Sequence, residues 1–110
     1  MFWAQLIPRS GSEQRGVRPV IVMSHDAFNQ APSWRSVIVI PLSTSARQAA
    51  RGPTAVRVPR GAAGLARESV ALGHQITTLD RAKLTKRIGT LPADTIAAVE
   101  AGVRAALDLD

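Results

Sequence analysis

The sequence contains no cysteine and no tyrosine, and only two tryptophans, two phenylalanines and two histidines. Without cysteine there is no disulfide framework and no thiolate chemistry, and two histidines leave few ligands for a transition metal. No apolar run approaches the roughly 18 residues that span a bilayer, and the first ten residues lack the pattern of a signal peptide. These absences predict a cytoplasmic chain with an aliphatic core and no membrane segment.

Arginine and aliphatic residues are plentiful instead. Twelve of the 14 cationic residues are arginine, and the formal net charge is +6. The 110 residues are 45% hydrophobic and 20% charged, which is typical of a globular chain and sufficient for one compact domain over residues 1–110. Arginine binds phosphate as a planar fork, so the charge favours an anionic partner, either nucleic acid or an acidic protein. A GC-rich genome would produce the same bias without any ligand.

Short runs of β-branched or alternating apolar residues predict strands along most of the chain. The strongest runs are 18–24 and 36–42, and Pro41 in the second run indicates an edge strand or a bulge. Segments 24–33 and 43–53 have the composition of a turn and a loop. Weaker patterns predict strands at 2–7, 54–58, 68–72, 75–79 and 86–91.

The last part of the chain has the pattern of an amphipathic helix. Pro92 suits the first turn, Asp94 complements the helix dipole, and Asp80 is expected to cap a separate helical turn within 79–84. Several short strands followed by one terminal helix predict a mainly β fold, a small β-barrel with a C-terminal helix against it. The apolar stripe of this helix consists of Ile96, Val99, Val103 and Leu107.

Common catalytic motifs are missing, including a phosphate-binding loop ending in GK[ST], CxxC, HExxH and GxSxG. Two polar segments adjoin the strongest strands. The stretch GSEQRGVRP supplies Ser12, Glu13, Gln14 and Arg18, and the strand end IPLSTS supplies Ser43 and Thr44. An arginine and hydroxyls at neighbouring strand ends could bind a phosphate through hydrogen bonds. The alternative is ordinary loop chemistry with a solvated or salt-bridged arginine.

Three segments together resemble the MazF/PemK toxins. GSEQRGVRPVIVMSHDAFN is similar to that family's GSEQ-x-G-x-RPV segment, and IPLSTS resembles its apolar-Pro-apolar-Thr/Ser strand end. ESVALGHQITTLDRAKLTKRIGTL resembles its third block, and the C-terminal helix also fits. The resemblance extends over nearly the whole chain with the same order and spacing.

The resemblance implies an SH3-like barrel that forms a homodimer and acts as a sequence-selective endoribonuclease, the toxin of a type II toxin–antitoxin pair. Such toxins need no metal or other cofactor and cut single-stranded RNA with the 2′-hydroxyl as nucleophile. They leave a 2′,3′-cyclic phosphate and a 5′-hydroxyl, and an antitoxin protein blocks the RNA site.

The family's catalytic arginine falls on Arg18 and its catalytic threonine falls on Ser43, with Thr44 as an alternative hydroxyl donor. Candidate substrate-binding residues are Ser12, Glu13, Gln14, Thr44 and Gln75. A rival hypothesis is a non-catalytic barrel: a toxin that binds a protein target, as the CcdB relatives do, or a nucleic-acid-binding module.

Overall fold

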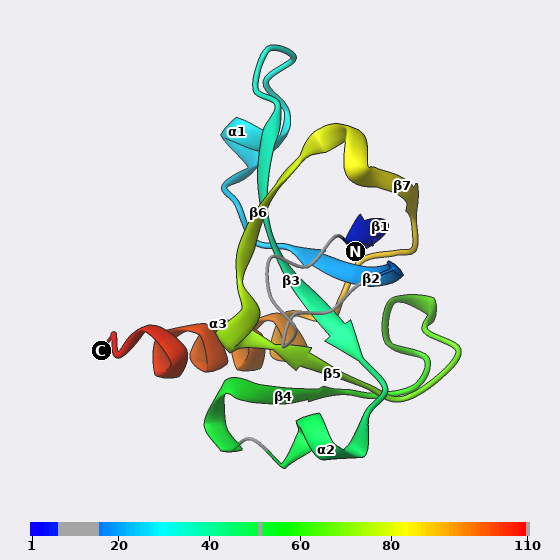
Figure 1. Ribbon diagram of the computed structural model, residues 1–110, viewed down its shortest axis with the longest axis vertical. Coiled ribbons are helices and arrows are strands. Elements are labelled where there is room, and N and C mark those ends of the chain that lie inside the picture. The colour runs from blue at the N-terminus through cyan, green and yellow to red at the C-terminus, as the bar shows by residue number, and fades with distance from the viewer. Residues whose placement is uncertain (7–15, 51, 110) are drawn as a thin grey trace.

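The computed structural model describes residues 1–6, 16–50 and 52–109, and seven strands lie in these ranges (Figure 1). The helices are α1 (Asp26–Asn29), α2 (Ala46–Ala49) and α3 (Ala93–Leu107), with 3-10 turns η1 (Gly52–Thr54), η2 (Ala62–Gly64), η3 (Gly73–Gln75) and η4 (Arg81–Lys83). The strands are β1 (Phe2–Leu6), β2 (Gly16–Val22), β3 (Ser36–Ser43), β4 (Ala55–Val58), β5 (Ser69–Leu72), β6 (Thr77–Asp80) and β7 (Leu84–Arg87). The predicted mainly β fold with a C-terminal helix is confirmed.

All the strand pairs are antiparallel, and β3 is central to the sheet. The order is β4-β5-β3-β2-β1-β7, and β6 also pairs with β3. One edge of β3 bonds β2, whereas the other edge bonds β6 along its first half and β5 at its end. The turn η3 separates β5 from β6, and η4 joins β6 to β7, so the sheet curls into a barrel-like shape without a β6–β7 ladder in the described residues.

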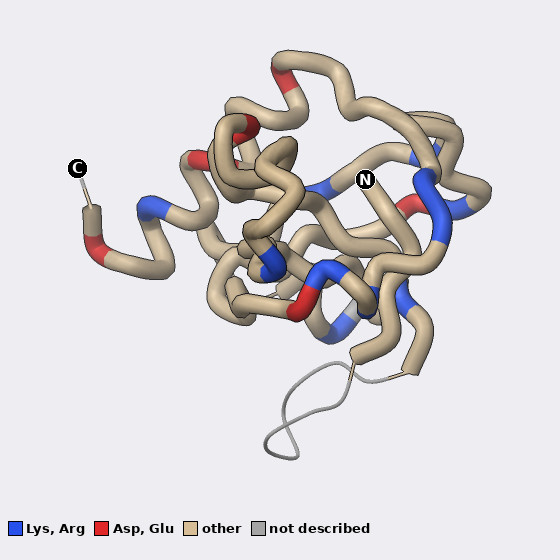
Figure 2. The backbone as a smooth tube through the Cα atoms, turned by 90° about the horizontal axis from the view of Figure 1, so that it is seen from above, with Lys and Arg blue, Asp and Glu red and all other residues tan. Residues whose placement is uncertain are grey.

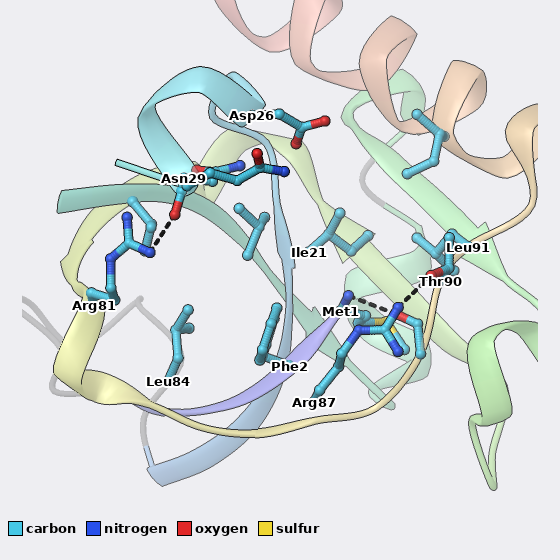
Figure 3. A pocket seen from close by; sticks show the side chains of 15 residues that line it. Met1, Phe2, Ile21, Asp26, Asn29, Arg81, Leu84, Arg87, Thr90 and Leu91 are labelled. Carbon is cyan, nitrogen blue, oxygen red and sulfur yellow. Dashed lines mark hydrogen bonds between the residues drawn. The ribbon is translucent and has the colours of Figure 1, made fainter. Parts of the chain in front are cut away.

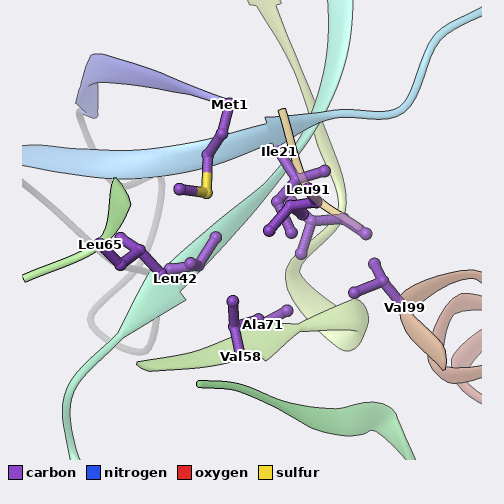
Figure 4. Close-up of a cluster of buried hydrophobic side chains, with 9 residues drawn as sticks. Met1, Ile21, Leu42, Val58, Leu65, Ala71, Leu91 and Val99 are labelled. Atoms are coloured by element: carbon purple, nitrogen blue, oxygen red, sulfur yellow. The ribbon is translucent and has the colours of Figure 1, made fainter. Parts of the chain in front are cut away.

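Two clusters of aliphatic side chains fill the interior. One includes Ala4, Val20 and Val39 on β1, β2 and β3. The other lies between β3, β4, β5 and α3 (Figure 4). Its buried members are Met1, Ile21, Ile40, Leu42, Val58, Leu65, Ala71, Leu91 and Val99.

The helix α3 approaches the sheet very closely at Gly102. A Cβ atom there would lie 2.8 Å from Val56 Cγ2, and a Cβ at Gly73 would lie 3.0 Å from the Gly102 carbonyl oxygen. Glycine normally weakens a helix interior, but here it permits backbone contact with η3. Leu107, predicted as part of the apolar stripe of this helix, is 50% exposed because it lies at the last turn of α3, beyond the sheet.

Four local predictions differ from the structure. Pro41 lies in a central strand instead of an edge strand, opposite Val20, at the point where β3 changes partner from β6 to β5. That break in the ladder removes the need for an amide donor on one side. The last strand covers Leu84–Arg87 instead of 86–91. The next two amides, of Ile88 and Gly89, both donate to the same carbonyl oxygen, Met1 O, so the regular strand pairing does not continue. Segments 24–33 and 43–53 contain the short helices α1 and α2, which open on capping positions at His25 and Ser45.

None of the helices in the described ranges is long and apolar enough to cross a membrane.

Candidate active site

Arg18 lies near the beginning of β2, where the strand emerges from the core. It pairs with Ala4 of β1, and its side chain is exposed, whereas Val20, two residues further along the same face, is fully buried. Gly16 begins the strand with a φ of 81°, a left-handed conformation that suits glycine. Pro19 follows with its φ restricted by the ring. These neighbours hold the backbone of Arg18 at the rim of the barrel.

Ser43 is the last residue of β3 and is buried, with 6% of its surface exposed. Its Oγ accepts a hydrogen bond of 3.1 Å from the amide of Ser45, the residue that precedes α2. A hydroxyl that accepts one hydrogen bond keeps its own hydrogen to donate. Thr44 lies just outside the strand and is exposed. The two candidate hydroxyls therefore differ: one is fixed in the sheet, the other is in a solvated connection.

The register of β2 and β3, continued beyond their last paired residues, directs Arg18 and Ser43 toward each other. The strands pair Val22 with Val39 and Val20 with Pro41. The β2–β3 ladder ends at the Val20–Pro41 pair. Continued in the same register by two residues, it directs Arg18 of β2 toward Ser43 of β3. Residues opposite each other in an antiparallel pair direct their side chains to the same face. In Figure 1 the end of β3 and the beginning of β2 lie on the same side of the molecule.

Gln75 lies away from this pair. It is half-buried in η3, after the end of β5, and its Nε2 is 3.4 Å from Nε2 of His74. Ser43 pairs with Val70 near the beginning of β5, whereas Gln75 is five positions further along the chain, beyond the end of that strand at Leu72. Ser12, Glu13 and Gln14 lie outside the described residues. The substrate-binding roles of these four residues stay predictions.

Arg57, on β4, belongs to no sequence motif that points to a site. It pairs with Val70 of β5, which pairs in turn with Ser43 of β3. The alternation in AVRV indicates that this arginine faces away from its apolar neighbours, but the sequence contains no signal for which strand lies beside which. The proximity of Arg57 to the strand end of Ser43 is therefore a result of topology.

A pocket of about 500 Å³ lies on another part of the barrel, between β1, β2, α1 and the segment that follows β6 (Figure 3). Apolar side chains such as Phe2, Ile21 and Leu84 form much of its wall, together with Arg81 and Arg87. Neither Arg18 nor Ser43 lines it. The pocket and the arginine–serine pair are separate features.

Basic residues are distributed widely along the backbone instead of forming one run (Figure 2). The described ranges contain no group of three or more His, Cys, Asp or Glu side chains placed to hold a metal ion. The chemistry that can be derived from this chain is accordingly that of guanidinium groups and hydroxyls, which donate hydrogen bonds to phosphate oxygens.

Comparison with known proteins identifies the family of the chain. The family model for the PemK-like, MazF-like toxin of type II toxin–antitoxin systems matches residues 1–107. The chain is 36% identical over 109 residues to Endoribonuclease MazF6 of Mycobacterium tuberculosis, covering 99% of this chain and 94% of that protein. It therefore belongs to the PemK/MazF toxin family, as the sequence resemblance predicted.

Solved structures of MazF proteins share the fold. The Mycobacterium tuberculosis toxin MazF-mt6 matches with a TM-score of 0.78 at 28% identity, over 99% of this chain and 96% of that one. A MazE–MazF structure from Deinococcus radiodurans matches with a TM-score of 0.72 at 25% identity, over 99% of this chain and 92% of that one.

Proposed function

We propose that this chain is a sequence-selective, metal-independent endoribonuclease that cleaves single-stranded RNA as the toxin of a type II toxin–antitoxin pair. The observation that carries the proposal is the register of β2 and β3, which, continued by two residues beyond the Val20–Pro41 pair, directs Arg18 toward Ser43. Two further findings support the same activity: the chain belongs to the PemK/MazF toxin family, and it is similar to a relative named as an endoribonuclease.

The reaction is an in-line attack by the 2′-hydroxyl on the adjacent phosphorus. The 2′-oxygen bonds to phosphorus and loses its proton, while the bond from phosphorus to the 5′-oxygen breaks and that oxygen gains a proton. The products are a 2′,3′-cyclic phosphate and a 5′-hydroxyl. Negative charge grows on the phosphate oxygens and on the departing oxygen. Positioned donors stabilise this charge more in the transition state than in the substrate.

Arg18 and Ser43 supply those donors. The guanidinium of Arg18 remains positively charged and presents several N–H groups in one plane, which suits the charge on the phosphate. The hydroxyl of Ser43 donates to the same group from a fixed position in the sheet. Thr44, outside the strand, lacks that support, so Ser43 is the catalytic hydroxyl in this proposal. Glu13, which lies outside the described residues, is a candidate for the base that takes the proton of the 2′-hydroxyl, because a carboxylate can accept a proton.

The wider assignment has three parts. A cognate antitoxin protein binds the chain, as the similarity to a MazE–MazF structure supports. The toxin acts as a homodimer, with residues 1–110 as a single domain. It acts in the cytoplasm, where its RNA substrate is found.

The decisive experiment is incubation of the purified protein with single-stranded RNA of varied sequence in EDTA. Specific fragments with a 2′,3′-cyclic phosphate and a 5′-hydroxyl are expected, with duplex RNA of the same sequence as the resistant control. Intact RNA would favour the rival hypothesis of a non-catalytic barrel. Fragments that need a divalent metal ion would exclude the mechanism given above.

A further inference from the structure

Four strands align Arg57 with the candidate active site in one lateral row. Arg57 of β4 pairs with Val70 of β5, and Val70 pairs with Ser43 of β3. The continued register of β2 and β3 then adds Arg18 at the far end of the row. Paired residues of antiparallel strands share a face, so Arg18, Ser43 and Arg57 are directed to the same side of the sheet. Two strand spacings of about 4.8 Å each separate the backbones of Ser43 and Arg57.

The opposite side of β4 belongs to the core. Val56 packs against the cluster beneath α3, and Val58 is fully buried in it. Because side chains alternate along a strand, Arg57 between them is directed away from α3. Its side chain is 77% exposed. The guanidinium is therefore accessible from the solvent on the face that carries Ser43.

Glu68 orients Arg57 without enclosing it. Arg57 Nε donates to Glu68 Oε1 at 2.5 Å, a contact that uses one of the five N–H donors of the guanidinium. The carboxylate is itself 49% exposed. Ion pairs at such exposed positions add little to folding stability. The fold therefore does not require the Arg57–Glu68 ion pair. The main effect of the pair is to orient the guanidinium of Arg57.

We propose that Arg57 is a phosphate-binding subsite for the RNA backbone, next to the phosphate held by Arg18 and Ser43, with Glu68 as its positioning residue. This inference rests on the proposed function. Proteins that bind single-stranded nucleic acid line the path of its backbone with positively charged side chains. The lateral row has one such side chain at each end, Arg57 and Arg18. Glu68 fixes the direction of the guanidinium and also offsets its charge, which moderates the affinity for RNA.

The test compares Arg57→Ala with Arg104→Ala, which removes the same charge from an exposed position on α3. KM and kcat for RNA cleavage are measured between 50 and 200 mM salt. Arg57→Ala is expected to raise KM about three- to tenfold and to leave kcat within about twofold, since the chemical step uses Arg18 and Ser43. The slope of log KM against log salt should become shallower by about 0.7, the value for one phosphate contact on a single strand.

Glu68→Gln should change KM in the opposite direction to Arg57→Ala, because it removes the negative charge that offsets Arg57 and keeps the side-chain shape. KM should fall, and the double variant should behave like Arg57→Ala alone. The inference is overturned if Arg57→Ala and Arg104→Ala have the same KM and salt slope, or if Glu68→Gln weakens binding as much as Arg57→Ala does.

A binding arm separates this inference from the proposed function. Fluorescence polarisation with a 2′-O-methyl single-stranded oligonucleotide, which has no nucleophile, reports affinity alone. If the wild type cleaves no RNA but Arg57→Ala still weakens binding and flattens the salt slope, the nuclease proposal fails and the subsite remains. If cleavage occurs and binding is indifferent to Arg57, the subsite fails and the nuclease proposal remains.

Discussion

Arg81 and Arg57 show two different uses of the same side chain. The guanidinium of Arg81 donates to backbone carbonyls in one segment, at 3.0 Å to Trp34 O, at 3.1 Å to Phe28 O, and also to Asn29 O (Figure 3). These hydrogen bonds hold η4 against the end of α1 and the residues that follow it. Arg57 has one carboxylate contact and is 77% exposed at the rim of the sheet. An arginine surrounded by carbonyl oxygens serves the fold, whereas one on an open strand face is accessible to a ligand.

The largest effect is expected at Arg18, which belongs to the rim. Arg18→Ala should lower kcat/KM for RNA cleavage about 10²–10³-fold, because it removes charge stabilisation that operates mainly in the transition state. The melting temperature should remain close to that of the wild type, with Arg104→Ala as the control for loss of one charge. A strongly lowered melting temperature would mean that Arg18 resembles Arg81 and is structural. Retained cleavage would remove Arg18 from the active site.

A smaller effect distinguishes the two hydroxyls at the end of β3. Ser43→Ala should reduce kcat about tenfold or more, since one donor to the phosphate is lost. Loss of the hydrogen bond from Ser45 should cost about 1 kcal/mol of stability. Thr44→Ala should leave kcat nearly unchanged, and Ser43→Thr should retain activity because it keeps the hydroxyl. Initial rates with a cleaved RNA provide the measurement. The reverse ranking would transfer the catalytic role to Thr44.

Arg81 is expected to affect stability alone. Arg81→Ala leaves three carbonyl oxygens without their charged donor and should lower the free energy of unfolding by about 2 kcal/mol. Arg81→Lys should recover only part of that loss, because an ammonium group does not reproduce the planar fork. Urea denaturation measures both variants, and kcat of the folded fraction should equal that of the wild type. Lost cleavage at unchanged stability would overturn the contrast between Arg81 and the rim.

Local patterns predicted much of this structure, and contacts between distant segments account for the rest. The strand at 36–42 and the helix after Pro92 were predicted closely, because burial periodicity and helix-start signals are local. The bounds 86–91 expected for the last strand were wrong, since its partner, β1, is 80 or more residues away in the sequence. The same reasoning applies to the candidate site. A family pattern pointed to Arg18 and Ser43, but Arg57 depends on the order of β4, β5 and β3.

Asp80 should give the smallest effect, and it tests the fixed region through pH. The amide of Ala82 donates to Asp80 Oδ1 at 2.8 Å, and Arg35 Nη2 donates to it at 3.1 Å. The Ala82 hydrogen bond and then the Arg35 guanidinium lower the pKa of this carboxyl below its ordinary value of 3.8. The ionised form is therefore favoured by folding, so its contribution is present above the ordinary pKa and is lost as pH falls through the lowered one.

Asp80→Asn keeps an oxygen for the Ala82 amide and removes only the charge. The gap in melting temperature between this variant and the wild type should be constant from pH 8 to about 5, and should narrow below about pH 4 as the wild-type carboxyl takes up its proton. The gap in melting temperature between Arg35→Ala and the wild type should narrow less at low pH. This variant removes the Arg35 guanidinium, but the Ala82 hydrogen bond still lowers the pKa of Asp80. A gap that stays constant down to pH 2 would mean that the Asp80 charge contributes nothing to this region. Its support would then come from Arg81 and the backbone alone.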